Sequence, residues 1–191
     1  MEAPETVIAS AIGAMLSSIA KKNIRGKVLD VRCGAKPYKR FFHECEWVGI
    51  DSRPVGDIAG SLEDMPLPDD TFDTVLCLDA LSYVFSPMRT VRECYRVLKP
   101  GGFFVAAVRN ISPDDNEILW KFSQRGLDFL VSSAGFDDIQ LLSDGKLIGS
   151  EWSSMANFEK YSINMSPDIT GWLDMMNDRY HAVSFVMARK L

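Results

Sequence analysis

Apolar residues follow two patterns along the chain, one typical of helices and one typical of buried strands. From Val7 to Ile19 they recur every three to four positions, which predicts a helix with one apolar face. The segment Lys27–Val31 is instead short and rich in branched apolar residues, as in a buried strand. The same criteria predict further strands at Trp47–Asp51, Ile58–Ala59, Phe72–Leu78, Phe103–Val108, Ile139–Leu142 and Ala182–Ala188.

Helices are predicted between most of these strands. Ser86 and Pro87 are favourable residues at the start of a helix, and apolar residues then recur at spacings of three and four as far as Leu98. Other helices are predicted near Tyr38–Phe42, over Leu127–Ala134 and from Ser166 onward. Because strands separated by helices form βαβ units, the pattern predicts an α/β fold with a mainly parallel sheet and helices on both faces.

The 191 residues are predicted to form one domain, since no repeat, low-complexity tract or linker divides them. Within it we distinguish an N-terminal helix (1–26), a core (27–142) and a C-terminal part (143–191). The C-terminal part is predicted to hold an insertion on the substrate side and the last strand.

Composition and charge argue against several classes of partner. The net charge of −5 disfavours nucleic acid, and no run of 18 apolar residues predicts a membrane span. Four widely spaced cysteines without a CxxC pair indicate reduced thiols, so we expect a cytoplasmic protein. With only two histidines, no metal site is expected.

Candidate chemistry lies where the first two predicted strands end. In an open α/β sheet, ligands bind beyond the carboxyl ends of the strands. The first strand continues into Asp30-Val31-Arg32-Cys33-Gly34, and the second ends at Asp51, 21 residues after Asp30. A carboxylate at this position can accept hydrogen bonds from both hydroxyls of a ribose. The two strand ends therefore predict a ribose-containing ligand.

Four motifs of the sequence are similar to those of one known family. Leu29–Gly34 is similar to the family's LD-x-GCG, and Glu63–Asp73 (EDMPLPDDTFD) to its acidic, proline-containing segment. Glu93–Gly102 (ECYRVLKPGG) matches the family's ExxRVLKPGG, and Ala134–Phe136 its AGF. By these motifs the chain resembles the small class I (type 11-like) S-adenosylmethionine-dependent methyltransferases, over about residues 27–142 and the final strand.

This resemblance implies a Rossmann-like fold with a seven-stranded sheet whose last strand is antiparallel. It implies S-adenosylmethionine as cofactor, with Asp30 and Gly34 at the methionine part and Asp51 at the ribose. Ser61 and Leu62 are implied at the adenine. The cofactor site further includes Arg32, Cys33, Ser52 and Cys77.

Two residues depart from the family pattern. Arg32 stands where the family has glycine, and Ser61 where it often has an acidic residue. Glycine favours a positive φ and close approach of the ligand, so Arg32 could obstruct the sulfonium through bulk and like charge. Alternatively, its guanidinium could bind the carboxylate of the cofactor. Ser61 can still hydrogen-bond the adenine amino group.

The predicted function is methyl transfer to a small-molecule acceptor by in-line displacement, which depends chiefly on positioning. Tyr83, where family members often have histidine, is the candidate on the acceptor side, and Trp120–Leu127 resembles the family segment beside the substrate opening. The alternative is a catalytically weakened member of the family that serves as a binding or partner subunit. The replacement of the usual glycine by Arg32 is the feature that indicates this alternative. A nicotinamide dehydrogenase is disfavoured because GxGxxG is missing after the first strand. The sequence leaves the acceptor and the oligomeric state open.

Overall fold

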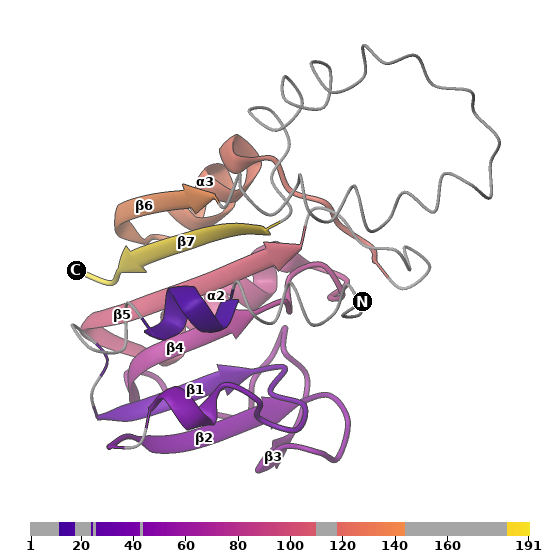
Figure 1. The fold of residues 1–191 in the computed structure, drawn as a ribbon, viewed down its shortest axis with the longest axis vertical. Coiled ribbons are helices and arrows are strands. Elements are labelled where there is room, and N and C mark those ends of the chain that lie inside the picture. Colours follow the sequence, from indigo (N-terminus) through magenta and orange to yellow (C-terminus); the bar gives the residue numbers. More distant parts are fainter. Residues whose placement is uncertain (1–11, 18–23, 25, 43, 110–117, 144–182) are drawn as a thin grey trace, which may run out of the picture.

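Seven strands form a single sheet in the order β3-β2-β1-β4-β5-β7-β6 (Figure 1). The structure is a computed structural model that describes residues 12–17, 24, 26–42, 44–109, 118–143 and 183–191. The strands are β1 (Lys27–Val31), β2 (Glu46–Asp51), β3 (Ile58–Ala59), β4 (Phe72–Leu78), β5 (Leu98–Arg109), β6 (Asp137–Ser143) and β7 (Val183–Arg189). Strands β1 to β5 pair in parallel, whereas β7 is antiparallel to both β5 and β6. The predicted fold class is confirmed.

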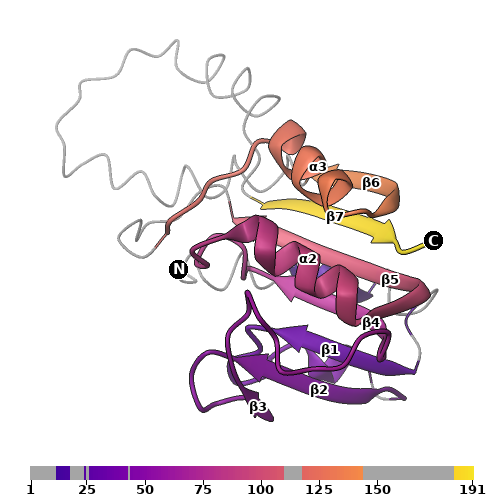
Figure 2. The ribbon, with the colours of Figure 1, turned by 180° about the vertical axis from the view of Figure 1, so that it is seen from behind.

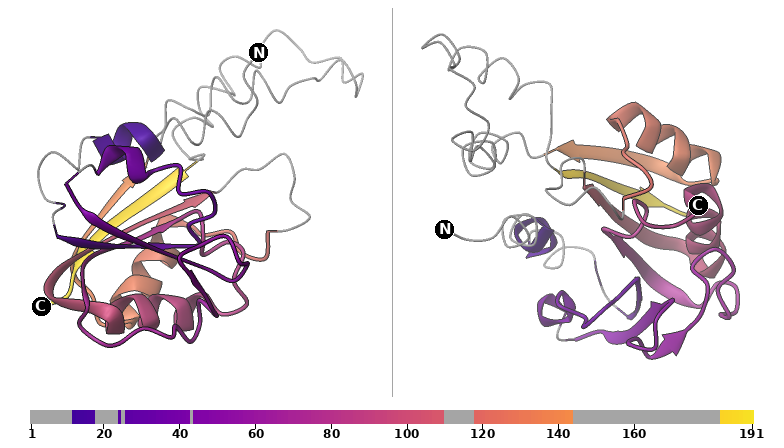
Figure 3. Two further views of the ribbon diagram at one scale, coloured as in Figure 1. Left: turned by 90° about the horizontal axis from the view of Figure 1, so that it is seen from below. Right: turned by 90° about the vertical axis from the view of Figure 1, so that its right-hand side faces the viewer.

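Helices cover both faces of the sheet. Helices α2 (Pro87–Val97) and α3 (Gln124–Ser133) lie on one face (Figure 2), and the helical residues 12–17 and the short 3-10 helix η1 (Lys39–Phe41) lie on the other (Figure 3). Successive strand residues supply the two faces in turn: Val28 packs in the same cluster as Leu16, and Leu29 in the same cluster as Val91 of α2. The core is therefore two apolar layers separated by the sheet.

Most predicted boundaries agree with the structure within two residues, but β5 begins earlier than expected. It starts at Leu98 rather than Phe103, because the backbone of the glycine turn stays in the sheet. Leu98 pairs with Phe72, and Gly101 donates its N–H to the Lys190 carbonyl at 2.6 Å. Gly101 has a φ of 77°, which favours glycine there. The helix predicted from Ser166 and the insertion lie outside the described residues.

Arg96 of α2 fastens the loop that precedes β4. Its guanidinium donates to Glu93 at 2.8 and 2.6 Å and to Asp69 at 2.6 Å. It also donates to the carbonyls of Met65 at 3.0 Å and Leu67 at 2.7 Å, and Glu93 accepts the Met65 N–H at 2.7 Å. The hydrogen bonds from Arg96 hold the pKa of Glu93 below its usual range, although burial opposes this. Two of the family-like motifs thus meet in one structural clamp.

No helix among the described residues has both the length and the apolar character needed to cross a membrane.

We expect Arg96→Ala to lower the free energy of unfolding by about 2–4 kcal/mol, because two backbone carbonyls and the half-buried Glu93 lose their donor. Urea unfolding followed by circular dichroism measures this change. Arg92→Ala, at an exposed arginine of the same helix, is the matched control and should change stability by about 0.5 kcal/mol or less. Equal effects of the two substitutions would contradict the clamp.

Candidate active site

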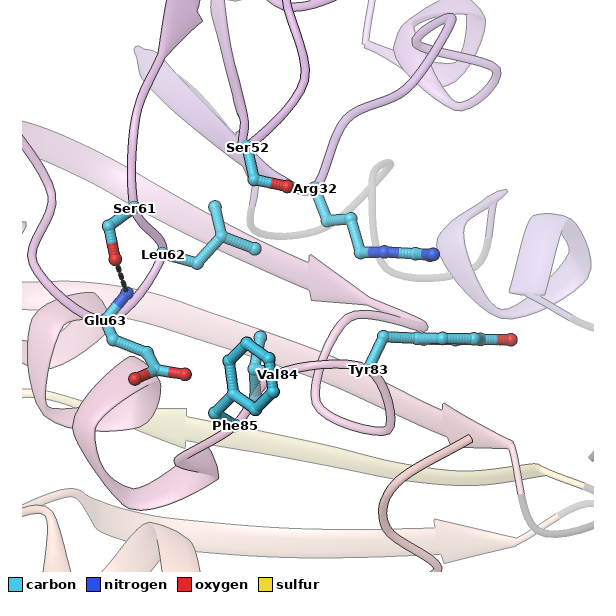
Figure 4. A pocket seen from close by; sticks show the side chains of 8 residues that line it. All are labelled: Arg32, Ser52, Ser61, Leu62, Glu63, Tyr83, Val84 and Phe85. Atoms are coloured by element: carbon cyan, nitrogen blue, oxygen red, sulfur yellow. Dashed lines mark hydrogen bonds between the residues drawn. The ribbon is translucent and has the colours of Figure 1, made fainter. Parts of the chain in front are cut away.

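Two cavities lie at the edge of the sheet where β1, β2 and β4 end. The first has a volume of about 310 Å³ and the second a volume of about 240 Å³. The first is lined by Arg32, Ser52, Ser61, Leu62, Glu63, Tyr83, Val84 and Phe85 (Figure 4). The second is lined by Asp30, Arg32, Cys33, Gly34, Ala35, Pro37, Tyr38, Arg53, Leu78 and Asp79. Arg32 lines both cavities and therefore stands at their junction.

The loop after β1 keeps a backbone conformation that favours glycine. Arg32 has a φ of 60° and Gly34 a φ of 48°. For arginine this left-handed conformation costs roughly 1–2 kcal/mol. The N–H groups of Arg32 and Cys33 both donate to the Ile50 carbonyl, at 2.8 and 3.2 Å. The loop is thus held by the end of β2, and the arginine adopts the conformation expected of the missing glycine.

Asp51, at the end of β2, is fully buried. One carboxylate oxygen accepts the Gly34 N–H at 3.0 Å. The other accepts the backbone N–H of Arg53 at 3.0 Å and its Nε at 3.2 Å. Burial alone would raise the pKa of Asp51, but the hydrogen bonds from Arg53 and Gly34 outweigh it and lower the pKa. Asp51 is therefore an ionised anchor of the loop, and a ribose would have to displace Arg53 to reach it.

Asp30, at the end of β1, has the opposite environment. Its side chain is 2% exposed, and its Oδ2 atom has no hydrogen-bond partner among the described residues. Burial raises the pKa of Asp30 to about 7; Asp51 adds to the increase and Lys36 partly offsets it. A buried carboxylate that lacks a donor and lines a cavity is suited to bind a ligand ammonium group.

Arg32 is stacked on Tyr83. The guanidinium carbon lies 3.9 Å from the ring centroid, and Nη1 donates to the Asp79 carbonyl at 3.3 Å. Figure 4 shows the two side chains running parallel, with the guanidinium directed away from Ser61 and Glu63. Such contacts with an aromatic face are typical of arginine. The predicted acceptor-side residue Tyr83 thus lies in the first cavity, beneath the cation that replaces the glycine.

The remaining predicted residues are divided between the cavities, with one exception. Ser52, Ser61 and Leu62 line the first cavity, and Cys33 and Gly34 line the second. The Ser61 hydroxyl accepts the Glu63 N–H at 3.1 Å (Figure 4). Cys77 lines neither cavity.

Cys77 lies within β4, and its assignment to the cofactor site stays a prediction. Alternate strand residues face opposite sides, and Cys77 shares its side with Val75. Its side chain is fully buried in the same core cluster as Cys94 of α2. It is a packing residue in this structure.

Sequence reasoning did not assign site roles to Glu63, Phe85 or Arg53. Glu63 and Phe85 line the first cavity, and Glu63 also accepts the Ser86 N–H at 2.8 Å. Arg53 follows Asp51 by two residues, a spacing from which aspartate commonly accepts a backbone hydrogen bond, so this contact had a local signal. No local sequence signal indicated Phe85, because an exposed aromatic residue before a helix has no distinctive sequence context.

The residues present fit a cofactor with an ammonium group at one end and a ribose and a base at the other. The second cavity offers the unpartnered carboxylate oxygen of Asp30, and the first offers Ser61 and the buried Leu62. The two cavities share Arg32 as a lining residue and are therefore adjacent. S-adenosylmethionine has this arrangement of groups.

Sheet order, the antiparallel β7 and this paired site define the class I methyltransferase fold. A model of the family described as methyltransferase domain matches residues 8–106, just over half of the chain. The chain therefore belongs to the methyltransferase domain family of class I S-adenosylmethionine-dependent methyltransferases.

A curated relative with the name of a methyltransferase is similar to this chain. The chain is 30% identical over 132 residues to 2-methyl-6-phytyl-1,4-hydroquinone methyltransferase 1, chloroplastic, of Oryza sativa subsp. japonica, covering 61% of this chain and 36% of the relative. The chain spans about a third of the length of the first curated relatives it matches.

Two solved structures share the fold at low sequence identity. Phosphoethanolamine N-methyltransferase 2 of Haemonchus contortus, in complex with S-adenosyl-L-methionine, has a TM-score of 0.66 at 16% identity, covering 93% of this chain and 51% of that one. The cyclase SpnF has a TM-score of 0.64 at 19% identity, covering 95% and 80%. At these identities the likeness shows the fold alone, and the cyclase shares it with the methyltransferases.

We expect the contribution of the buried Asp30 to the free energy of unfolding to fall as the pH rises. The pKa is raised in the folded state from 3.8 to about 7, so the unfolded chain releases this proton first, and stability present below about pH 4 is lost on approaching pH 7. At about 1.4 kcal/mol per pKa unit, the loss attributable to Asp30 is up to about 4 kcal/mol. Asp30→Asn should remove it, so the difference in unfolding free energy between the variant and the wild type should grow from pH 4 to pH 8. If the unfolding free energies of the wild type and Asp30→Asn changed with pH in the same way, this interpretation of Asp30 would be wrong.

Proposed function

We propose that this domain transfers a methyl group from S-adenosylmethionine to a small-molecule acceptor. The observation that carries the proposal is the pair of cavities that meet at Arg32, one of which contains the unpartnered Asp30 carboxylate. S-adenosylmethionine supplies an electrophilic methyl group on a sulfonium sulfur. The protein contributes mainly binding and orientation, which convert an encounter of two molecules into a reaction within one complex.

Each part of the cofactor has a candidate partner. Asp30 is proposed to bind the ammonium group of the methionine part, and the Cys33–Gly34 backbone to lie against it. Asp51 is proposed to receive the ribose hydroxyls in place of Arg53, whose side chain is 62% exposed. Ser61 and Leu62 are proposed to hold the adenine. Tyr83 remains the candidate on the acceptor side.

The acceptor is proposed to be a small molecule. The net charge of −5 disfavours a nucleic-acid acceptor. The relative from Oryza sativa bears the name of a hydroquinone methyltransferase, which makes a hydroxylated aromatic compound one class to test. The cytoplasmic location and the single-domain organisation stay predictions from the sequence.

One alternative function has specific support. A weakened member of the family could serve as a binding or partner subunit, because two arginines lie where a cofactor would bind. Arg32 lines both cavities, and the Arg53 side chain donates a hydrogen bond to the Asp51 carboxylate. Titration of the purified chain with S-adenosylmethionine and S-adenosylhomocysteine in a calorimeter decides between the two functions. Absence of binding of either ligand would favour the alternative.

We expect Asp51→Ala to reduce the affinity for S-adenosylhomocysteine about tenfold or more, because a charge-assisted hydrogen bond contributes about 1.5–3 kcal/mol. Calorimetric titration measures the loss, and circular dichroism checks that the variant remains folded. Asp64→Ala, at an exposed carboxylate outside both cavities, serves as the control and should bind like the wild type. Unchanged affinity of the Asp51 variant would show that the ribose assignment is wrong.

Arg32→Gly should strengthen binding of S-adenosylmethionine more than fivefold and affect S-adenosylhomocysteine less. The substitution removes a cation beside the expected sulfonium, and S-adenosylhomocysteine lacks that charge. Only a change in affinity larger than fivefold is informative, because the added backbone freedom of glycine by itself costs about 0.5–1 kcal/mol. Equal weakening of both ligands would mean instead that Arg32 binds the cofactor carboxylate. Binding that exists only in the glycine variant would support the weakened-subunit alternative.

A further inference from the structure

Arg32 is a cation without a carboxylate partner among the described residues. Its guanidinium has one hydrogen bond there, from Nη1 to the Asp79 carbonyl at 3.3 Å, and it otherwise rests on the Tyr83 ring. The other arginine that lines a cavity, Arg53, is paired with Asp51 at 3.2 Å. Because a guanidinium carries five N–H donors, Arg32 retains donors for a ligand.

The position of this cation coincides with the point where a donor and an acceptor must meet. In the proposed function, the methionine part of the cofactor lies in the second cavity and the adenosine part in the first. The sulfur that joins them must therefore pass Arg32, which lines both cavities. The attacking atom of the acceptor must approach the same junction. A neutral acceptor would leave two like charges there with no anion between them.

An apolar surface extends from the same wall of the first cavity. Phe85 lines that cavity and is 84% exposed. Leu119 and Trp120 are 52% and 43% exposed, and they are held against this wall. The Leu119 N–H donates to the Ser82 carbonyl at 2.8 Å, and the Trp120 indole N–H donates to the Val84 carbonyl at 2.9 Å. Large apolar side chains held exposed beside a cavity are typical of a ligand-binding surface.

We propose that Arg32 is a specificity-determining residue that selects an acceptor with an acidic aromatic hydroxyl, bound as its anion. The oxyanion lies on the Arg32 guanidinium, and the apolar body of the acceptor lies along Phe85 towards Leu119 and Trp120. The inference rests on the proposed function and adds the substrate class to it. Replacing the usual glycine by arginine then places a permanent positive charge beside the oxygen, which favours its ionised form.

The test uses 4-nitrophenol as a probe, because its anion absorbs visible light and its ionisation can be followed when bound. The full chain is saturated with S-adenosylhomocysteine, and the bound probe is titrated with acid and base. We expect the wild type to prefer the anion about tenfold or more over the neutral form, which lowers the pKa of the bound probe by about one unit. Arg32→Gln should abolish this preference, and Arg32→Lys should retain part of it.

Two controls separate charge recognition from packing. Arg40→Gln removes an exposed arginine that also lies over a ring, 5.0 Å from the Phe41 centroid and outside both cavities, and it should leave the probe unaffected. 4-Nitroanisole has the same ring but no ionisable hydroxyl. Its affinity should be unchanged in Arg32→Gln and reduced in Phe85→Ala.

The outcomes distinguish this inference from the function on which it rests. If S-adenosylhomocysteine binds but the probe does not bind, or is ionised equally in the wild type and in Arg32→Gln, the inference is wrong and the proposed function stands. If S-adenosylhomocysteine does not bind the wild type, both are overturned. Loss of 4-nitroanisole binding in Arg32→Gln would also contradict the inference, because it would assign Arg32 a packing role.

Discussion

Two consecutive acceptors at the end of β2 hold the whole candidate site together. The Ile50 carbonyl receives the N–H groups of Arg32 and Cys33, and the Asp51 carboxylate receives that of Gly34. Three successive donors of the loop after β1 are thus satisfied by the neighbouring parallel strand. In this arrangement Arg32 and Gly34 both have a positive φ. Arg32 lines both cavities and Cys33 and Gly34 line the second, so this loop contributes to the walls of both.

Two aspartates at the same edge of the sheet have opposite electrostatic roles because of their partners. Asp51 and Asp30 are both buried, and burial alone penalises the charge of each. Hydrogen bonds from Arg53 and Gly34 reverse this for Asp51 and keep its pKa low, whereas Asp30 lacks such donors and its pKa is raised. The satisfied carboxylate stabilises the loop, and the unsatisfied one is left for a ligand.

The motifs that identify the family are largely architectural in this structure. Arg96 and Glu93 clamp the loop from Met65 to Asp69 onto α2. Asp73 accepts the Lys27 N–H at 2.8 Å and the Lys99 ammonium at 2.7 Å, which ties the start of β1 to β4 and β5. None of these contacting residues lines either cavity. The similarity at these two motifs therefore supports the fold, whereas Asp30 and Gly34 of the motif after β1 line the second cavity.

The sequence by itself determined the order of strands and helices, because hydrophobic periodicity is a local property that each segment carries independently. It also determined the turn positions of the glycines, and it located Asp30, Arg32, Asp51, Ser61 and Tyr83 at strand ends or in the loops after them. Tertiary structure alone decided which of these residues share a cavity and which partners they meet. The contact between Arg32 and Tyr83 joins positions far apart in the chain. Cys77 and Cys94 are likewise distant in sequence, yet they pack in the same core cluster. Local pattern cannot encode such pairings, because the direction of a side chain and the charge state of a buried acid depend on neighbours that only the packed sheet brings within reach.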